Sequence, residues 1–127
     1  MLSTISENGY PYGVPVNYVF YNGYIYFHSA KEGHKIDNIK NNSKVSFSIV
    51  GSEEVLSEQF TTNYESVIAF GEVEEVYELE KGEALLEIIK KYSPEFIEKG
   101  EKYIEALESK TAVLKIDIKH LSGKSRR

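Results

Sequence analysis

A histidine, a serine and a lysine lie close together in residues 24–41 (YIYFHSAKEGHKIDNIKN). In this segment a strand-like alternation of side-chain types is followed by the spacing of apolar residues typical of a helix. The alternation predicts a strand, and Gly33 stands at the opening of the short helix that follows. Such a turn points free backbone N–H groups and the positive end of the helix dipole outward, which suits a phosphate group. The Lys35 ammonium and the turn amides could bind it, and at Gly33 no Cβ atom blocks a close approach. The predicted anion site comprises His28, Ser29, Ala30, Gly33, His34 and Lys35.

Each of these polar side chains also has an ordinary structural explanation. Lys35 could be a solvated helix residue, and His34 could contribute only surface polarity. His28 ends the alternating segment and could be a half-buried strand histidine bonded to a neighbouring carbonyl group. The residues alone leave both explanations open.

A second segment with a chemical use comes just before, at residues 11–20 (PYGVPVNYVF). Its apolar residues recur at the strand period of two, but Pro15 lies inside the run and cannot donate to a strand ladder. Interrupted pairing would leave neighbouring amides and the Asn17 side chain free to bind the polar edge of a flat ring. The alternative is an ordinary core strand with a proline at its edge. The candidate ring contacts are Val14, Pro15, Val16 and Asn17.

The remaining pattern predicts one domain, residues 1–127, with antiparallel strands and helices to one side. Asn22-Gly23 is the favoured two-residue hairpin turn, so residues 14–20 and 24–28 should be antiparallel neighbours. Gly71 lies inside a long strand pattern, where it predicts a bend or a bulge. The polar stretch 51–63 is expected to be a long loop. We expect strands at 2–6, 11–21, 24–28, 44–50, 65–77 and 111–118, and helices at 31–42, 79–92 and 94–107.

Composition excludes several classes of protein. The net charge of −5 argues against a broad nucleic-acid surface, and the basic residues 119–127 are most simply a solvated end. The absence of cysteine excludes disulfides, thiolate metal sites and a cysteine nucleophile. No apolar run approaches the ~20 residues of a membrane helix. No HExxH, GxSxG or GxGxxG motif occurs, and we expect no metal site.

The order of these segments, with residues 45–50 (VSFSIV) after them, resembles the flavin-binding proteins related to pyridoxamine 5'-phosphate oxidase. Within that family the chain looks most like the nitroimidazole-resistance (NimA-like) branch, over nearly its whole length. The resemblance implies an α+β, mainly β, six-stranded antiparallel split barrel. A short helix would follow the third strand, and a helical pair would precede the last. It also implies FMN as the cofactor, bound at the interface of a homodimer.

The resemblance also assigns further residues to the site. Residues 64–67 (YESV) are similar to the family's Tyr-x-Ser-Val, and residues 122–124 (SGK) to a Thr/Ser-Gly-Lys ending. These matches place Ser66 near the cofactor and Lys124 against the flavin of the other subunit. His28 matches a position linked to activity in NimA-like proteins, which makes it the candidate catalytic residue. The family commonly has arginine where this chain has His34, so phosphate affinity should fall as pH rises through the imidazole pKa.

The function implied is that of a cytoplasmic FMN-dependent oxidoreductase that reduces a small acceptor such as a nitroaromatic. Flavin carries the redox chemistry, so no acid–base dyad is required. The alternatives are a flavin carrier without turnover, and a split barrel that uses deazaflavin or haem. We do not expect true pyridoxamine 5'-phosphate oxidase activity, because those enzymes carry a longer C-terminal segment with an Arg-x-His substrate clamp. Family members also have a helix ahead of the first strand, so the natural start could lie upstream of Met1.

Overall fold

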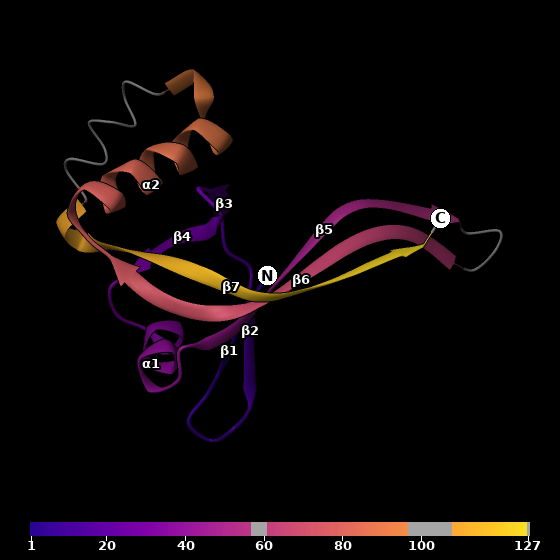
Figure 1. The fold of residues 1–127 in the computed structure, drawn as a ribbon, viewed down its shortest axis with the longest axis horizontal. Helices are drawn as coiled ribbons and strands as arrows, with labels where there is room; N and C mark the ends of the chain where they lie inside the picture. Colours follow the sequence, from indigo (N-terminus) through magenta and orange to yellow (C-terminus); the bar gives the residue numbers. More distant parts are fainter. Residues whose placement is uncertain (57–60, 97–107, 127) are drawn as a thin grey trace.

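The computed structural model describes residues 1–56, 61–96 and 108–126 (Figure 1). Within these residues a seven-stranded sheet carries two α-helices and two short 3-10 turns. The strands are β1 (Leu2–Ile5), β2 (Pro11–Val14), β3 (Tyr18–Tyr21), β4 (Tyr24–Ala30), β5 (Lys44–Leu56), β6 (Thr61–Val76) and β7 (Thr111–Arg126). The helices are α1 (His34–Asn41) and α2 (Glu78–Tyr92), and the 3-10 turns are Pro94–Phe96 and Glu108–Lys110.

All strand pairs are antiparallel, in the order β2-β1-β5-β6-β7-β4-β3. The two edge strands, β2 and β3, are consecutive in the sequence and only residues 15–17 join them. An extended chain spans at most about 14 Å between the Cα atoms of Val14 and Tyr18. The two edges of the sheet must therefore come close at this point, so the sheet curls into a barrel that is left open along residues 15–17. We call these three residues the seam.

The prediction of six strands was wrong, because Pro15 divides the expected strand 11–21 into two. Val14 pairs with Leu2 of β1, whereas Tyr18 pairs with Phe27 of β4. Only the second half of that segment is therefore the hairpin partner of β4. The hairpin turn itself is confirmed, since Asn22 and Gly23 have φ angles of 51° and 84° and connect β3 directly to β4.

The long loop expected at residues 51–63 was also wrong for residues 51–56 and 61–63, whereas residues 57–60 lie outside the described part of the chain. β5 continues to Leu56, and its ladder with β6 runs on from Ser52↔Glu65 to Leu56↔Thr61 after a register shift at Val50/Ser52. Backbone pairing does not require apolar periodicity, which is why the polar sequence concealed these strands. β7 likewise continues to Arg126, beyond the expected end at 118. The C-terminal part of β5, the N-terminal part of β6 and the C-terminal part of β7 extend together from the barrel body (Figure 1). We call this extension the arm.

A register shift between Phe70 and Gly71 confirms the irregularity expected at Gly71. The extra residue is Lys119 of β7, because Phe70 pairs with His120 and Gly71 with Ile118. A Cβ atom at position 71 would collide with the backbone carbonyl oxygen of Asp117 and lie 2.9 Å from Cγ2 of Ile116. Glycine is therefore required at this position, where the backbone of β6 lies against that of β7.

Two apolar clusters lie on opposite faces of the sheet, one with each helix (Figure 1). Alternation along β4 separates them, since Ile25 and Phe27 enter the first cluster and Tyr26 enters the second. Ile36 and Ile39 of α1 are both buried in the first cluster. The first cluster comprises Leu2, Ile25, Phe27, Ile36, Ile39, Val45, Phe47, Ala69, Val73, Ala112, Leu114 and Ile116. The second comprises Val19, Tyr26, Val76, Ala84, Leu85, Ile88 and Val113.

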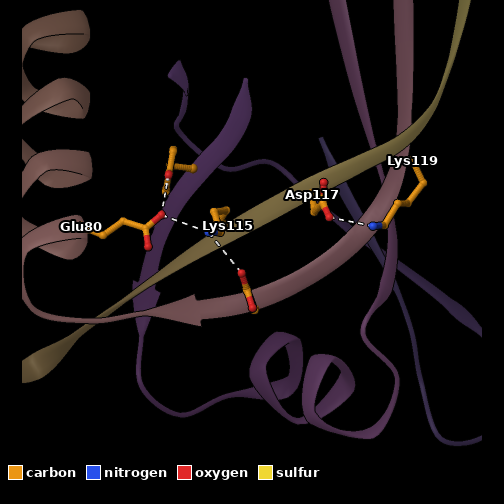
Figure 2. Close-up of polar contacts among 6 residues, drawn as sticks. Glu80, Lys115, Asp117 and Lys119 are labelled. Carbon is orange, nitrogen blue, oxygen red and sulfur yellow. Dashed lines mark hydrogen bonds and ion pairs between the residues drawn. The ribbon is translucent and has the colours of Figure 1, made fainter. Parts of the chain in front are cut away.

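The side chain of Lys115 on β7 lies beneath the first turns of α2 and is only 14% exposed (Figure 2). Its ammonium is 3.1 Å from a Glu80 carboxylate oxygen and 3.2 Å from one of Glu74. The same Glu80 oxygen accepts a hydrogen bond from the Tyr26 hydroxyl at 2.7 Å. Burial would lower the pKa of Lys115, but the two carboxylates outweigh it and the pKa is raised. The bond from Tyr26 and the ammonium of Lys115 together hold the pKa of Glu80 low.

The helix expected at residues 94–107 lies mostly outside the described residues. Its first residues, Pro94–Phe96, form a 3-10 turn directly after α2. α1 begins at His34, three residues later than expected, because residues 31–33 form a bend. None of the described helices is both long and apolar enough to span a bilayer.

Candidate functional site

The turn between β4 and α1 places open backbone donors at the surface. Gly33 is the N-cap residue of α1, with a φ angle of 139° that disfavours any side chain, and its carbonyl accepts the first helical bond from Asp37 at 3.0 Å. No side chain caps the amides of the first helical turn. These amides and the positive end of the helix dipole are available to an anion, as the sequence analysis expected.

A histidine and a lysine lie close to each other at this turn. His28 lies on the exposed face of β4, and its pKa is lowered first by partial burial and then by the positive charge of Lys35. Lys35 is half-buried in the first turn of α1, and burial lowers its pKa as well. Within the part of the chain that the structure describes, Lys35 forms no ion pair. The turn therefore carries the positive charge of Lys35, which no ion pair among the described residues neutralises.

Ser29 and Ala30 occupy the end of β4 in different ways. Ser29 is 8% exposed, and its hydroxyl donates to the Ala30 carbonyl at 2.8 Å. The hydroxyl is therefore already engaged with the backbone, so a ligand would have to compete for it. Ala30 is exposed where the chain leaves the sheet, so its small side chain leaves room beside the turn.

His34 contacts the β1–β2 hairpin. Its ring stacks on Tyr12, with 4.1 Å between the ring centroids, and its Nε2 lies 3.1 Å from Oγ of Ser6. Asn38, one helical turn further along, donates to Oγ of Ser6 at 3.3 Å and to Oγ1 of Thr4 at 3.0 Å. These contacts fix α1 against β1, and sequence reasoning missed them. The only available signal was Asn38, a polar residue on the apolar side of the helix.

The seam has the character expected from Pro15. Residues 15–17 belong to neither β2 nor β3, so their backbone groups take no part in the sheet ladders there. Val14 and Val16 pack against the first apolar cluster, whereas Pro15 and Asn17 are exposed. The seam thus offers an apolar support on its inner side and free polar groups on its outer side.

Ser66 and Lys124 are cross-strand neighbours on the arm. They border a cavity of about 430 Å³ whose lining includes Ile49, Gly51 and Gly123. The arm extends away from α1, so one chain does not bring these two residues to the β4–α1 turn (Figure 1). The other predicted site residues, on the turn and the seam, belong to the barrel body.

The sequence pattern of the pyridoxamine 5'-phosphate oxidase family matches residues 2–125 of this chain. The chain belongs to this family. Comparison with curated protein sequences gives no match. Among the described residues, no group of three or more histidine or acidic side chains could hold a metal ion.

Solved structures of low sequence identity share the family fold. The conserved hypothetical protein Rv2991 from Mycobacterium tuberculosis is 18% identical, with a TM-score of 0.83 over 99% of this chain and 76% of that one. A candidate 5-nitroimidazole antibiotic resistance protein from Bacteroides thetaiotaomicron is 23% identical, with a TM-score of 0.73 over 96% and 73%. An FAD-binding protein from Mesorhizobium loti is 22% identical, with a TM-score of 0.67 over 99% and 85%. At these identities the likeness shows the fold.

Proposed function

We propose that this member of the family binds FMN and passes electrons from the reduced flavin to a small acceptor such as a nitroaromatic. The observation that carries the proposal is the uncapped start of α1 beside Lys35 and His28. Unneutralised positive charge that is partly withdrawn from water is costly unless an anion binds there. A phosphate monoester has the size and charge to accept hydrogen bonds from both the helix amides and the Lys35 ammonium.

The seam suits the ring of the same ligand. Val14 and Val16 supply apolar support, while the Val16 and Asn17 amides and the Asn17 side chain supply donors and an acceptor for a polar ring edge. A phosphate site and a ring site on one barrel fit a flavin mononucleotide better than a free phosphate. Flavin-binding proteins among the fold neighbours are consistent with this choice.

Bound flavin would supply the two electrons that, with two protons, convert a nitro group to a nitroso group and water. The protein's own part is to hold the cofactor, exclude water and handle protons. His28 is suited to the last task, because its lowered pKa keeps the imidazole neutral near pH 7, where a ring nitrogen can accept or donate a proton. The proposed role of Lys35 is to bind the phosphate, and that of Gly33 is to let it approach.

A second copy of the chain would complete the site. Val50, Ser66 and Lys124 are cross-strand neighbours and share one face of the arm, and period-two alternation puts Ile68 and Phe70 on the same face. Val50, Ile68 and Phe70 are 61%, 37% and 43% exposed. An apolar face that carries two predicted cofactor contacts far from the turn fits a homodimer in which each arm reaches its partner's flavin.

Absorption spectra of purified protein test the proposal. We expect a flavin spectrum after incubation with FMN, and reoxidation of the reduced flavin by nitrofurazone faster than in protein-free controls. A colourless protein that takes up no FMN would end the flavin proposal, and a Soret band would replace it with haem. Binding of FMN without faster reoxidation would favour a carrier. Light scattering that reports a monomer with FMN bound would contradict the dimer.

A further inference from the structure

A cavity of about 840 Å³ opens where the barrel meets the arm, at the C-terminal end of α2. Its volume is within the usual range of small-molecule sites. The β3–β4 hairpin, the base of the arm and the last turns of α2 contribute its walls. Apolar side chains predominate in these walls, namely Val19, Phe20, Ile25, Ile49, Val67, Ala69, Ile118 and Leu121.

The apolar wall continues the first cluster outward onto the arm. Ile49 is paired with Val67 and Ala69 with Leu121, so these four side chains lie on one face of the arm. This face is opposite to the one that carries Ser66 and Lys124. Val67 and Leu121 are 41% and 57% exposed, so a flat apolar molecule could cover them. The cavity and the proposed subunit contact therefore occupy different faces.

Lys91 lies at the edge of this apolar wall. The Lys91 ammonium donates to the backbone carbonyl of Tyr18 at 2.9 Å and lies 3.5 Å from the centroid of the Tyr18 ring. Tyr92 completes the attachment, because its hydroxyl accepts a bond from the Tyr18 amide at 3.2 Å. Tyr18 directly follows the seam, so the end of α2 is fixed beside the place proposed for the flavin ring.

The two lysines at the cavity differ in their partners. Lys90 forms an ion pair with Glu87 at 3.2 Å. Lys91 makes no ion pair within the described residues, and its ammonium has three N–H donors, of which the Tyr18 carbonyl takes one. Lys91 therefore retains the capacity to bind an anionic group at the rim.

We infer that this cavity binds the electron acceptor, and that it selects a planar aromatic carboxylate whose ring lies on the apolar wall and whose carboxylate meets Lys91. The inference rests on the proposed function, because it places the acceptor next to the seam. The positive charge of Lys91 at the rim favours an anionic ligand. A neutral aromatic would gain the apolar contact alone, whereas an aromatic carboxylate also gains a charge-assisted hydrogen bond.

Binding of two matched probes to the FMN-loaded, oxidised protein tests the inference without turnover. 4-Nitrobenzoate and 4-nitrobenzamide have nearly the same shape and differ in charge. By titration calorimetry we expect the wild type to bind the benzoate about tenfold more tightly, the ratio expected for one charge-assisted bond. Lys91→Met should bring the ratio close to one, and Lys91→Arg should keep it above one. The matched control Lys90→Met should leave it unchanged.

The outcomes separate this inference from the proposed function. Unchanged affinity of Lys91→Met for the neutral amide and for FMN would show that the cavity wall and β3 remain in place. A benzoate preference that survives Lys91→Met would overturn the inference, as would a wild type that binds FMN but neither probe. If neither probe binds and Leu121→Glu converts a dimer into a monomer, the cavity is a contact between subunits and not a ligand site. Failure to bind FMN at all would remove the proposed function itself.

Discussion

Lys35 and Lys115 are both lysines partly withdrawn from water, yet their surroundings have opposite electrostatic consequences. Burial lowers the pKa of Lys35, and no described carboxylate offsets that cost. Lys115 has Glu74 and Glu80 within 3.2 Å, and its pKa is raised despite burial (Figure 2). The ion pair between Lys115 and Glu80 attaches α2 to the sheet. Lys35 has no such partner among the described residues, so its ammonium can bind an anionic ligand. The comparison assigns a structural role to the contact between the start of α2 and the sheet, and ligand binding to the start of α1.

Replacing Lys35 should produce the largest effect, and it should appear in ligand binding. We expect Lys35→Ala to weaken FMN binding by about 1–3 kcal/mol, the range for losing a charge-assisted contact. The ligand-free protein should not lose stability, because an unpaired, partly buried ammonium is removed. Quenching of flavin fluorescence in a titration measures the affinity, and Lys40→Ala, in the last turn of α1, is the matched control. Equal affinity in the two variants would take Lys35 out of the site.

Replacing Lys115 should produce the opposite pattern. Lys115→Ala should lower the free energy of unfolding by about 1–2 kcal/mol, because it leaves Glu80 without its cation while solvent screens part of the loss. FMN affinity should not change. Urea unfolding of the ligand-free protein measures the effect, with Lys119→Ala as the control, since the Lys119–Asp117 pair is exposed (Figure 2). A variant that unfolds like the wild type would remove the contrast with Lys35.

Replacing one glycine in each helix-bearing region by alanine extends the comparison to backbone conformation. Gly33→Ala should cost about 1 kcal/mol of stability, because alanine is strained at a φ angle of 139° although nothing lies within 4 Å of the added Cβ. It should also weaken FMN binding by narrowing the approach to the amides. Gly82→Ala, inside α2 and equally unobstructed, should stabilise the protein by up to about 1 kcal/mol. Thermal unfolding distinguishes them, and a shift of the same sign in both would contradict the assignment of Gly33.

The smallest effect expected is on the titration of His28. Because its pKa in the folded protein is below the ordinary 6.5, His28 favours folding fully above 6.5, and this contribution is lost as pH falls from 6.5 towards the folded pKa. His28→Gln should therefore flatten the pH dependence of stability in that window. An anion bound beside Lys35 should raise the pKa of His28. NMR titration of the imidazole with and without FMN measures this shift, and an unchanged pKa would place the phosphate elsewhere.

Local sequence patterns were sufficient for much of the fold and for the core of the candidate site. Asn22-Gly23 specified its hairpin, Pro15 the break in pairing and Gly71 the bulge, because each depends on the backbone preferences of one or two residues. The placement of Gly33 and Lys35 at the start of a helix was equally local, as was that of His28 at the end of the strand before it.

Tertiary structure decided what depends on partners distant in the sequence. Residues 52–56 form strand rather than loop because β6 supplies backbone partners for them. Lys115 is mostly buried because Glu80, on a separate helix, pairs with it. His34 lies against Tyr12, and Lys91 against Tyr18, because tertiary packing brings α1 to β2 and α2 to β3. The chain by itself determined the hairpin turn, the break at Pro15 and the chemical types at the site. Which charges are neutralised was settled by packing, because an ion pair depends on a distance in space that no sequence spacing encodes.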